Sequence, residues 1–162
     1  MPAPTELRIP APLWKQLIEQ LHARTGGERH ESGAFLLGHI TEQGRQVMQV
    51  LYFDDLHPEV HARGVVELPA AAFRSLWAIV RERGLQVVAD VHTHPYGARQ
   101  SEIDRKNPLI ATRGHIALIV PNFARPPLER EALGIYIYEG DHQWQTLYGG
   151  GHRFLVLENK HD

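Results

Sequence analysis

The stretch VVADVHTHPYGARQSEID, residues 87–104, decides how this chain folds and where its chemistry lies. Its first half is an apolar run that predicts a buried strand, and His92 and His94 close that strand. Side chains two residues apart in a strand point to the same face, about 6.6 Å apart along the chain, so the two imidazoles project together. Ser101 followed by Asp104 matches the hydroxyl-then-acid pattern that begins a helix. The next element therefore brings a carboxylate back towards the histidines.

Two imidazoles and a carboxylate are the protein ligands that a catalytic zinc ion needs, with a fourth position left for water. We therefore predict a zinc site at His92, His94 and Asp104. A His-x-His pair alone is weak evidence, because a chain with eleven histidines forms such pairs readily by chance. The alternative is a strand that simply ends in two histidines. The buried strand before the pair and the helix start after it favour the metal.

Composition bounds the remaining possibilities. The 162 residues, 43% of them hydrophobic, predict a single domain spanning residues 1–162 with a sizeable core. The absence of cysteine excludes disulfides, thiolate zinc sites and a cysteine nucleophile. A net charge of −2 indicates no basic surface for nucleic acid. No signal peptide and no apolar run of the roughly 20 residues that cross a bilayer are present, so we expect a cytoplasmic protein without membrane partners.

The pattern of apolar residues predicts more strands than helices. Helices are expected over residues 13–21 and 69–83 and from residue 101, and strands over 34–38, 46–53, 65–68, 85–91, 115–120, 133–138, 143–147 and 154–157. Most strands are neighbours in sequence, so we predict an α+β fold, a three-layer arrangement with a mixed, largely antiparallel sheet flanked by helices. The connections 54–64 and 121–131 are long for a compact domain and are candidate lids over the site.

Other polar residues near the predicted strands carry less weight. The segment HPEVH at residues 57–61 resembles a metal motif, but Pro58 blocks the helix that ligands four residues apart require. His30 and His39 flank the first strand and are more typical of solvated histidines. Asp90 shares the face of the two histidines, where it either orients an imidazole or forms a simple salt bridge.

Taken together, these motifs resemble those of the JAMM (MPN-plus, or JAB-domain) zinc metalloproteases, in a compact prokaryotic form. ESGAFLLG at residues 31–38 is similar to the family's glutamate at the mouth of an apolar strand, and HTHP with the later Ser-x-x-Asp is similar to its metal motif. The resemblance covers about residues 13–120. It implies a cytidine-deaminase-like fold, zinc on His92, His94 and Asp104, Glu31 as general base, and Ser101 as a donor to the oxyanion.

One feature of this chain departs from the family pattern. The spacer from Pro95 to Gln100 has six residues, one fewer than is usual, and Gln100 stands where a proline often precedes the serine. A loop can absorb such a deletion without moving the helix start. Asp104 remains the predicted acid in preference to Glu102, because it alone keeps the Ser-x-x-Asp spacing.

The resemblance also implies a substrate. This is an amide or isopeptide bond at the carboxyl end of a ubiquitin-like protein, whose extended tail would add as a strand to a sheet edge. We expect the modifier and its activating and conjugating enzymes to be encoded separately. Two alternatives stay open. One is a zinc hydrolase of another amide, such as a peptidoglycan peptide or a cysteine-linked small molecule. The other is a non-catalytic scaffold, against which the intact motif residues argue.

Overall fold

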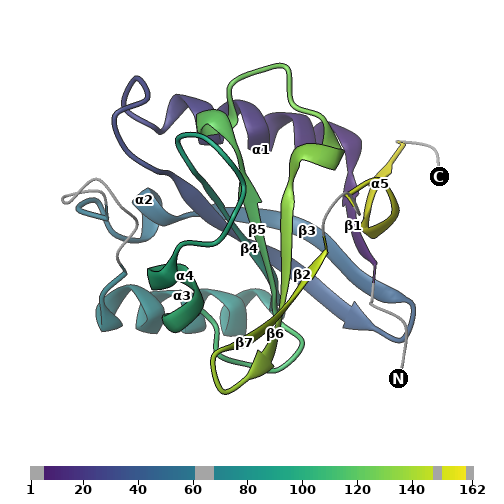
Figure 1. Ribbon diagram of the computed structural model, residues 1–162. Helices are drawn as coiled ribbons and strands as arrows, with labels where there is room; N and C mark the ends of the chain where they lie inside the picture. The colour runs from purple at the N-terminus through teal and green to yellow at the C-terminus, as the bar shows by residue number, and fades with distance from the viewer. Residues whose placement is uncertain (1–5, 61–67, 148–150, 160–162) are drawn as a thin grey trace.

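The computed structural model describes residues 6–60, 68–147 and 151–159. Within these ranges, eight strands form one sheet in the order β7-β6-β5-β4-β2-β3-β1-β8 (Figure 1). The strands are β1 (Leu7–Pro10), β2 (Gly33–Thr41), β3 (Gly44–Tyr52), β4 (Gln86–Thr93), β5 (Ile116–Val120), β6 (Gly134–Gly140), β7 (Gln143–Leu147) and β8 (Leu155–Glu158). The helices are α1 (Ala11–Ala23), α2 (Phe53–Leu56), α3 (Ala70–Arg83), α4 (Glu102–Lys106) and α5 (Gly151–Phe154), with 3₁₀ turns η1 (Asn122–Ala124) and η2 (Arg130–Ala132).

The sheet is mixed and mainly antiparallel, as the sequence predicts. Antiparallel pairing joins β3 to β2, β2 to β4, β5 to β6, and β6 to β7. Parallel pairing joins β4 to β5 and joins β1 to both β3 and β8. The predicted α+β fold class is therefore confirmed.

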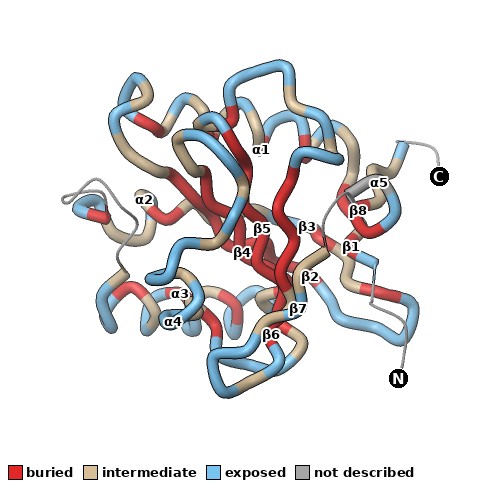
Figure 2. The backbone as a smooth tube through the Cα atoms, in the orientation of Figure 1, coloured by how far each residue is buried: buried red, intermediate tan, exposed pale blue. Residues whose placement is uncertain are grey.

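Helices cover both faces of the sheet, which gives the three layers. Helix α1 buries Trp14, Leu17 and Leu21, whose three- and four-residue spacing forms one apolar face. Helix α3 packs Leu76 and Val80 against the opposite face. Figure 1 shows the two helices on either side of the sheet, and Figure 2 shows the buried residues concentrated along its central strands.

Strand β4 lies in the middle of the sheet and separates the two cores. Val91 belongs to the core under α1, whereas Val87 belongs to the core under α3. Asp90 pairs in register with Ala117 of β5, and His92 with Ile119. Ala117 and Ile119 belong to a small third cluster on the α3 side. Because neighbouring strands align side chains at the same register, Asp90 and His92 face this side too.

Short elements account for the differences from the predicted pattern. Strand β1 is missing from the prediction because its four residues take their register from β3 and β8 rather than from a long apolar run. The predicted loop 54–64 begins in the single turn of α2, and the loop 121–131 contains η1 and the start of η2. Three of the four residues of the predicted strand 65–68 lie outside the described residues. None of the helices in the described ranges has the length and hydrophobicity to span a bilayer.

Candidate metal centre

His92 and His94 stand side by side at the end of β4. Their Nε2 atoms are 3.0 Å apart and their ring centroids 4.8 Å apart. The backbone around them is fixed, since the His94 N–H donates to the Val120 carbonyl at 2.9 Å and the His94 carbonyl accepts from the Phe123 N–H at 2.8 Å. The side chain of His92 is 10% exposed and that of His94 12%. Both imidazoles are therefore held in place and largely shielded from water.

Asp104 reaches the histidines from the first turn of α4. Ser101 is the N-cap of this helix, and its Oγ accepts from the Asp104 N–H at 3.0 Å. The Asp104 carboxylate in turn accepts from the Ser101 N–H at 2.9 Å, which completes a capping box. Asp104 Oδ2 lies 3.1 Å from His94 Nε2, and Oδ1 lies 3.5 Å from His92 Nε2. Glu102 instead pairs with Lys106 in solvent, at 2.9 Å.

Glu31 approaches from the turn that leads into β2. Its carboxylate and the two imidazoles place one ligand atom each within 4.8 Å of one another. The next residue, Ser32, is buried and tied on two sides. Its N–H donates to Thr93 Oγ1 at 2.9 Å, and its hydroxyl donates to the Leu21 carbonyl of α1 at 2.6 Å. Glu31 is thus attached to a residue that joins α1 to the end of β4.

Gly33 lets this turn lie close to β4. A Cβ at this position would lie 2.4 Å from the ring of Phe53 and 2.7 Å from the Val91 carbonyl, so a side chain does not fit without displacement. Gly33 pairs in register with His92. The glycine of the Glu-Ser-Gly motif therefore permits the close approach that brings Glu31 beside the histidines.

The two carboxylates of the site differ in basicity. Burial raises the pKa of Glu31, and the nearby His92 and His94 oppose that shift only in part. Burial would also raise the pKa of Asp104, but hydrogen bonds with His92 and His94 hold it well below its usual range. Asp104 is therefore fixed as an anion that suits a cation, whereas Glu31 is the better proton acceptor.

The donor atoms fit a small divalent metal ion. Ligands about 2.0–2.1 Å from a tetrahedral ion lie roughly 3.3 Å from each other. The separations among His92 Nε2, His94 Nε2 and the Asp104 oxygens are 3.0, 3.1 and 3.5 Å. Two imidazoles and one carboxylate also leave one coordination position open for water or substrate. The structure thus brings the predicted metal ligands together, with Glu31 beside them and Ser101 at the helix cap.

Several polar residues of the sequence lie elsewhere. Asp90 Oδ2 is 2.6 Å from Nε2 of His115, and both residues are buried, so the hydrogen-bond partner of Asp90 is His115 rather than His92. His57 follows α2, and His61 lies outside the described residues. His39 is exposed, and His30 Nδ1 lies 3.0 Å from the Glu31 carbonyl.

The sequence did not reveal the buried hydroxyls of Ser32 and Thr93. Ser32 directly follows Glu31 and Thr93 lies between the two histidines, and this closeness to predicted site residues was the one signal in the sequence. Tyr136 of β6 and Trp144 of β7 gave no signal in the sequence, because their contacts depend on the order of strands in the sheet.

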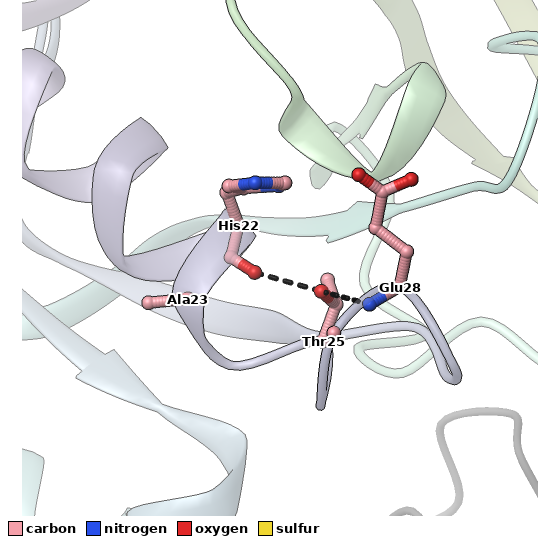
Figure 3. Close-up of a pocket in the computed structure, with 5 residues that line it drawn as sticks. His22, Ala23, Thr25 and Glu28 are labelled. Atoms are coloured by element: carbon pink, nitrogen blue, oxygen red, sulfur yellow. Dashed lines mark hydrogen bonds between the residues drawn. The ribbon is translucent and has the colours of Figure 1, made fainter.

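A separate hollow of about 350 Å³ lies at the end of α1, where His22, Ala23, Thr25, Gly27 and Glu28 line it (Figure 3). Thr25 closes the turn there, since its hydroxyl donates to the His22 carbonyl at 2.7 Å and accepts from the Glu28 N–H at 3.0 Å. The polar side chains are also engaged. His22 Nδ1 lies 3.0 Å from the Phe123 carbonyl, and Glu28 pairs with Arg125. These contacts join the turn after α1 to the η1 segment.

The chain is similar to a known protein family, to a named relative and to two solved structures. The family described as prokaryotic homologues of the JAB domain matches residues 10–145. A protein of Sinorhizobium fredii named probable metalloprotease is 29% identical over 129 residues, which cover 79% of this chain and 80% of that protein. A solution structure of a Desulfitobacterium hafniense protein has a TM-score of 0.64 at 16% identity, covering 95% of this chain and 94% of its own. One from Salinibacter ruber has a TM-score of 0.59 at 22% identity, covering 93% and 91%.

Proposed function

This chain belongs to the prokaryotic homologues of the JAB domain, and on that basis we propose that it is a zinc-dependent peptidase. Its proposed substrate is the amide or isopeptide bond that follows the carboxyl-terminal tail of a ubiquitin-like protein. One observation carries the proposal. His92, His94 and Asp104 converge to within 3.0–3.5 Å of one another, and Glu31 lies beside them.

The donor set suits zinc in particular. Two imidazole nitrogens and one carboxylate oxygen, with a position left open, are typical of catalytic zinc sites. His92, His94 and Asp104 are the proposed ligands. When bound, zinc would supply Lewis acidity that polarises the scissile carbonyl and makes water a better nucleophile at neutral pH.

The protein side chains would handle the proton and the developing charge. Glu31, whose pKa burial raises, accepts the proton of the attacking water and then delivers it to the leaving amine. The Ser101 hydroxyl donates to the oxyanion of the tetrahedral intermediate. A single donor of this kind is worth about 3 kcal/mol of transition-state stabilisation. Ser101 keeps this proton available because its Oγ accepts, rather than donates, in the capping box.

Two exposed apolar side chains support a polypeptide substrate. Tyr96 is 84% exposed and Ile103 is 69% exposed, more than any other large hydrophobic residue in the described part of the chain. Tyr96 lies two residues after His94, and Ile103 directly precedes Asp104. Apolar side chains left in water beside a reaction site are suited to contact apolar residues of an extended tail. Activating and conjugating enzymes would be separate proteins.

The decisive experiment compares Glu31→Gln with Glu102→Gln. Both changes convert a carboxylate to an amide near the site, but Glu102 is a solvent-exposed partner of Lys106. We expect about one zinc ion per chain in all three proteins. Cleavage of a reporter fused to a ubiquitin-like tail should fall about 10²- to 10⁴-fold in Glu31→Gln and stay near the wild-type rate in Glu102→Gln. A chain without bound metal, or full activity in Glu31→Gln, would refute the catalytic proposal.

A substrate panel separates the proposed substrate from other amides. The same protein is incubated with ubiquitin-like fusions, with a peptidoglycan digest and with cysteine-linked small molecules. Turnover of the fusions alone supports the proposed substrate. Turnover of another amide, lost in Glu31→Gln, would keep the hydrolase and replace its substrate.

A further inference from the structure

Apart from the contacts of Asp104 with His92 and His94, helix α4 is poorly anchored by its own side chains. It has five residues, and none of them is buried. The Glu102–Lys106 ion pair lies in solvent, with side chains 80% and 67% exposed, so it contributes little to holding the helix. The spacer before it, from Pro95 to Gln100, has no regular secondary structure. The position of Asp104 must therefore depend on contacts made by other elements.

Tyr136 of β6 makes the first of these contacts. The residue is 2% exposed, and its hydroxyl lies against the backbone of the spacer. Tyr136 Oη donates to the Ala98 carbonyl at 2.5 Å and accepts from the Gln100 N–H at 3.2 Å. Ala98 also packs on the cluster of Ala117, Ile119 and Tyr136. A single phenol thus holds the spacer at two points, the second immediately before Ser101.

Gly134 makes room for the spacer on the sheet. A Cβ at Gly134 would lie 2.1 Å from the Ala98 carbonyl, a distance that no side chain tolerates. Ile119 pairs in register with both His92 and Gly134, so the three residues form one row across β4, β5 and β6. The spacer consequently crosses the sheet two strands from His92, over a surface that is free of a side chain at Gly134.

Trp144 of β7 makes the second contact, on the helix itself. Its Nε1–H donates to the carbonyl of Arg105 at 3.0 Å, which lies in the last turn of α4. The indole ring packs against Tyr138, with ring centroids 4.9 Å apart. The carbonyls at the end of a helix have no partner within it, so a donor from another strand stabilises this end.

We propose that Tyr136 and Trp144 are positioning residues that hold the six-residue spacer and α4 against β6 and β7 and so fix Asp104 opposite His92 and His94. Tyr136 binds the backbone of the spacer and Trp144 binds the backbone of α4, so both act on the site through Asp104. The consequence for metal affinity rests on the proposed function. The bracing of the spacer itself does not.

Two tyrosines of β6 provide a matched test. Tyr136→Phe removes the hydroxyl that binds the spacer, whereas Tyr138→Phe removes one that accepts the His142 N–H of the adjacent turn, at 3.1 Å. Both changes keep the ring. Cobalt(II) is the metal probe, because its visible absorption reports the number and geometry of ligands. Loss of a contact that orients a ligand typically weakens metal binding by 10- to 100-fold.

We expect Tyr136→Phe to weaken cobalt binding at least about 10-fold and to alter its absorption spectrum, with Tyr138→Phe close to wild type. In the metal-free protein, the amides of Gln100 and Asp104 should exchange with solvent faster in Tyr136→Phe than in the wild type or in Tyr138→Phe. Trp144→Phe should raise exchange in α4 and weaken cobalt binding in the same direction.

Each outcome decides a different point. Unchanged exchange at Gln100 and Asp104 in Tyr136→Phe overturns the bracing, as does an equal loss of cobalt affinity in Tyr136→Phe and Tyr138→Phe. A wild-type protein that binds neither cobalt nor zinc refutes the proposed function, and the exchange measurements on the metal-free protein still decide the bracing. Gly134→Ala, which pushes the Ala98 carbonyl away, should reproduce the effects of Tyr136→Phe.

Discussion

Thr93→Val tests how the turn that carries Glu31 is attached to the metal centre. Thr93 is 0% exposed and Ser32 is 1% exposed. The Ser32 N–H donates to Thr93 Oγ1 at 2.9 Å, and Thr93 Oγ1 also lies 3.5 Å from both the hydroxyl and the carbonyl of Ser32. Valine has nearly the shape of threonine but cannot accept this hydrogen bond. The change therefore leaves a buried N–H without a partner, at little cost in volume.

The expected loss of stability follows from the unsatisfied Ser32 N–H. A buried, unsatisfied donor costs about 1–3 kcal/mol of unfolding free energy. For a chain of this size, each kcal/mol shifts the Tm by about 2–4 °C. We therefore expect Thr93→Val to reduce the unfolding free energy of the metal-free protein by about 2 kcal/mol, which lowers its Tm by about 4–8 °C. Thermal and denaturant unfolding followed by circular dichroism measure both quantities.

The functional effect of Thr93→Val should be selective. The backbone that carries the two histidines keeps its hydrogen bonds, from the Thr93 N–H to the Ser32 carbonyl and from the His94 N–H to the Val120 carbonyl, both at 2.9 Å. Zinc affinity should therefore stay within about twofold of wild type. Ser32, the neighbour of Glu31, loses one of its attachments and keeps its hydroxyl bond to the Leu21 carbonyl. Misplacement of a catalytic group by about 1 Å costs up to 10²-fold in rate. The expected result is a lower kcat with the metal retained.

Thr93→Ser is the control, because it keeps the hydroxyl and removes one buried methyl group at a cost of about 1 kcal/mol. It should lose stability without the loss in kcat. If Thr93→Val melts at the wild-type temperature, or if both variants lose kcat equally, the hydroxyl does not hold Glu31 and the reasoning fails.

Three further predictions follow from the same structure. Gly33→Ala should cost about 1–3 kcal/mol of unfolding free energy, because its Cβ would overlap Phe53 and the Val91 carbonyl. The control Gly97→Ala, whose Cβ would have nothing within 4 Å, should cost under about 0.5 kcal/mol. Equal Tm values for the two variants would contradict the close approach at Gly33. Removal of metal by a chelator should lower the Tm, since a ligand present at about 100 times its Kd stabilises the native state by about 2.7 kcal/mol. Added zinc should restore the Tm of the wild type but should not raise the Tm of Asp104→Ala. Asp90→Ala should cost about 1–3 kcal/mol of unfolding free energy by leaving the buried His115 side chain without its Asp90 partner. The double variant Asp90→Ala, His115→Ala should cost less than the sum of the two single changes. Strict additivity in this cycle would show that the interaction between the two side chains contributes nothing to stability.

Local rules were sufficient to predict part of the site. Alternation along β4 and the residue that follows it places His92 and His94 on one face, and the capping pattern places Asp104 in the first turn of α4. Both rules act over a few residues, so they hold whatever the rest of the chain does. The same locality explains why α1 and α3 were predicted from their apolar spacing, while β1 and α2 were not. Four-residue elements are too short to show a period, and their neighbours in the sheet decide them.

Glu31 depends on a longer-range relation. It lies about sixty residues before the histidines, and only the antiparallel pairing of β2 with β4, which sets Gly33 opposite His92, brings it to them. No periodicity in the sequence specifies that pairing, so the prediction came from family resemblance. The structure adds the physical reason. Ser32 and Gly33 fix the turn through buried hydrogen bonds and a contact too close for a side chain.

The path of the six-residue spacer, Pro95 to Gln100, is not predictable from local sequence, because it depends on contacts with distant strands. The capping pattern fixes the residue at which the helix starts, but a six-residue connection before Ser101 leaves the position of the helix relative to the histidines undetermined, because several loop paths are open to it. The path chosen depends on Tyr136, whose hydroxyl binds Ala98 and Gln100, and on the absence of a side chain at Gly134. These residues follow the spacer by more than thirty positions and reach it only because β6 lies beside β5 in the sheet. A change in loop length can thus be compensated by strands that carry no ligand, which makes β6 and β7 part of what sets the position of Asp104.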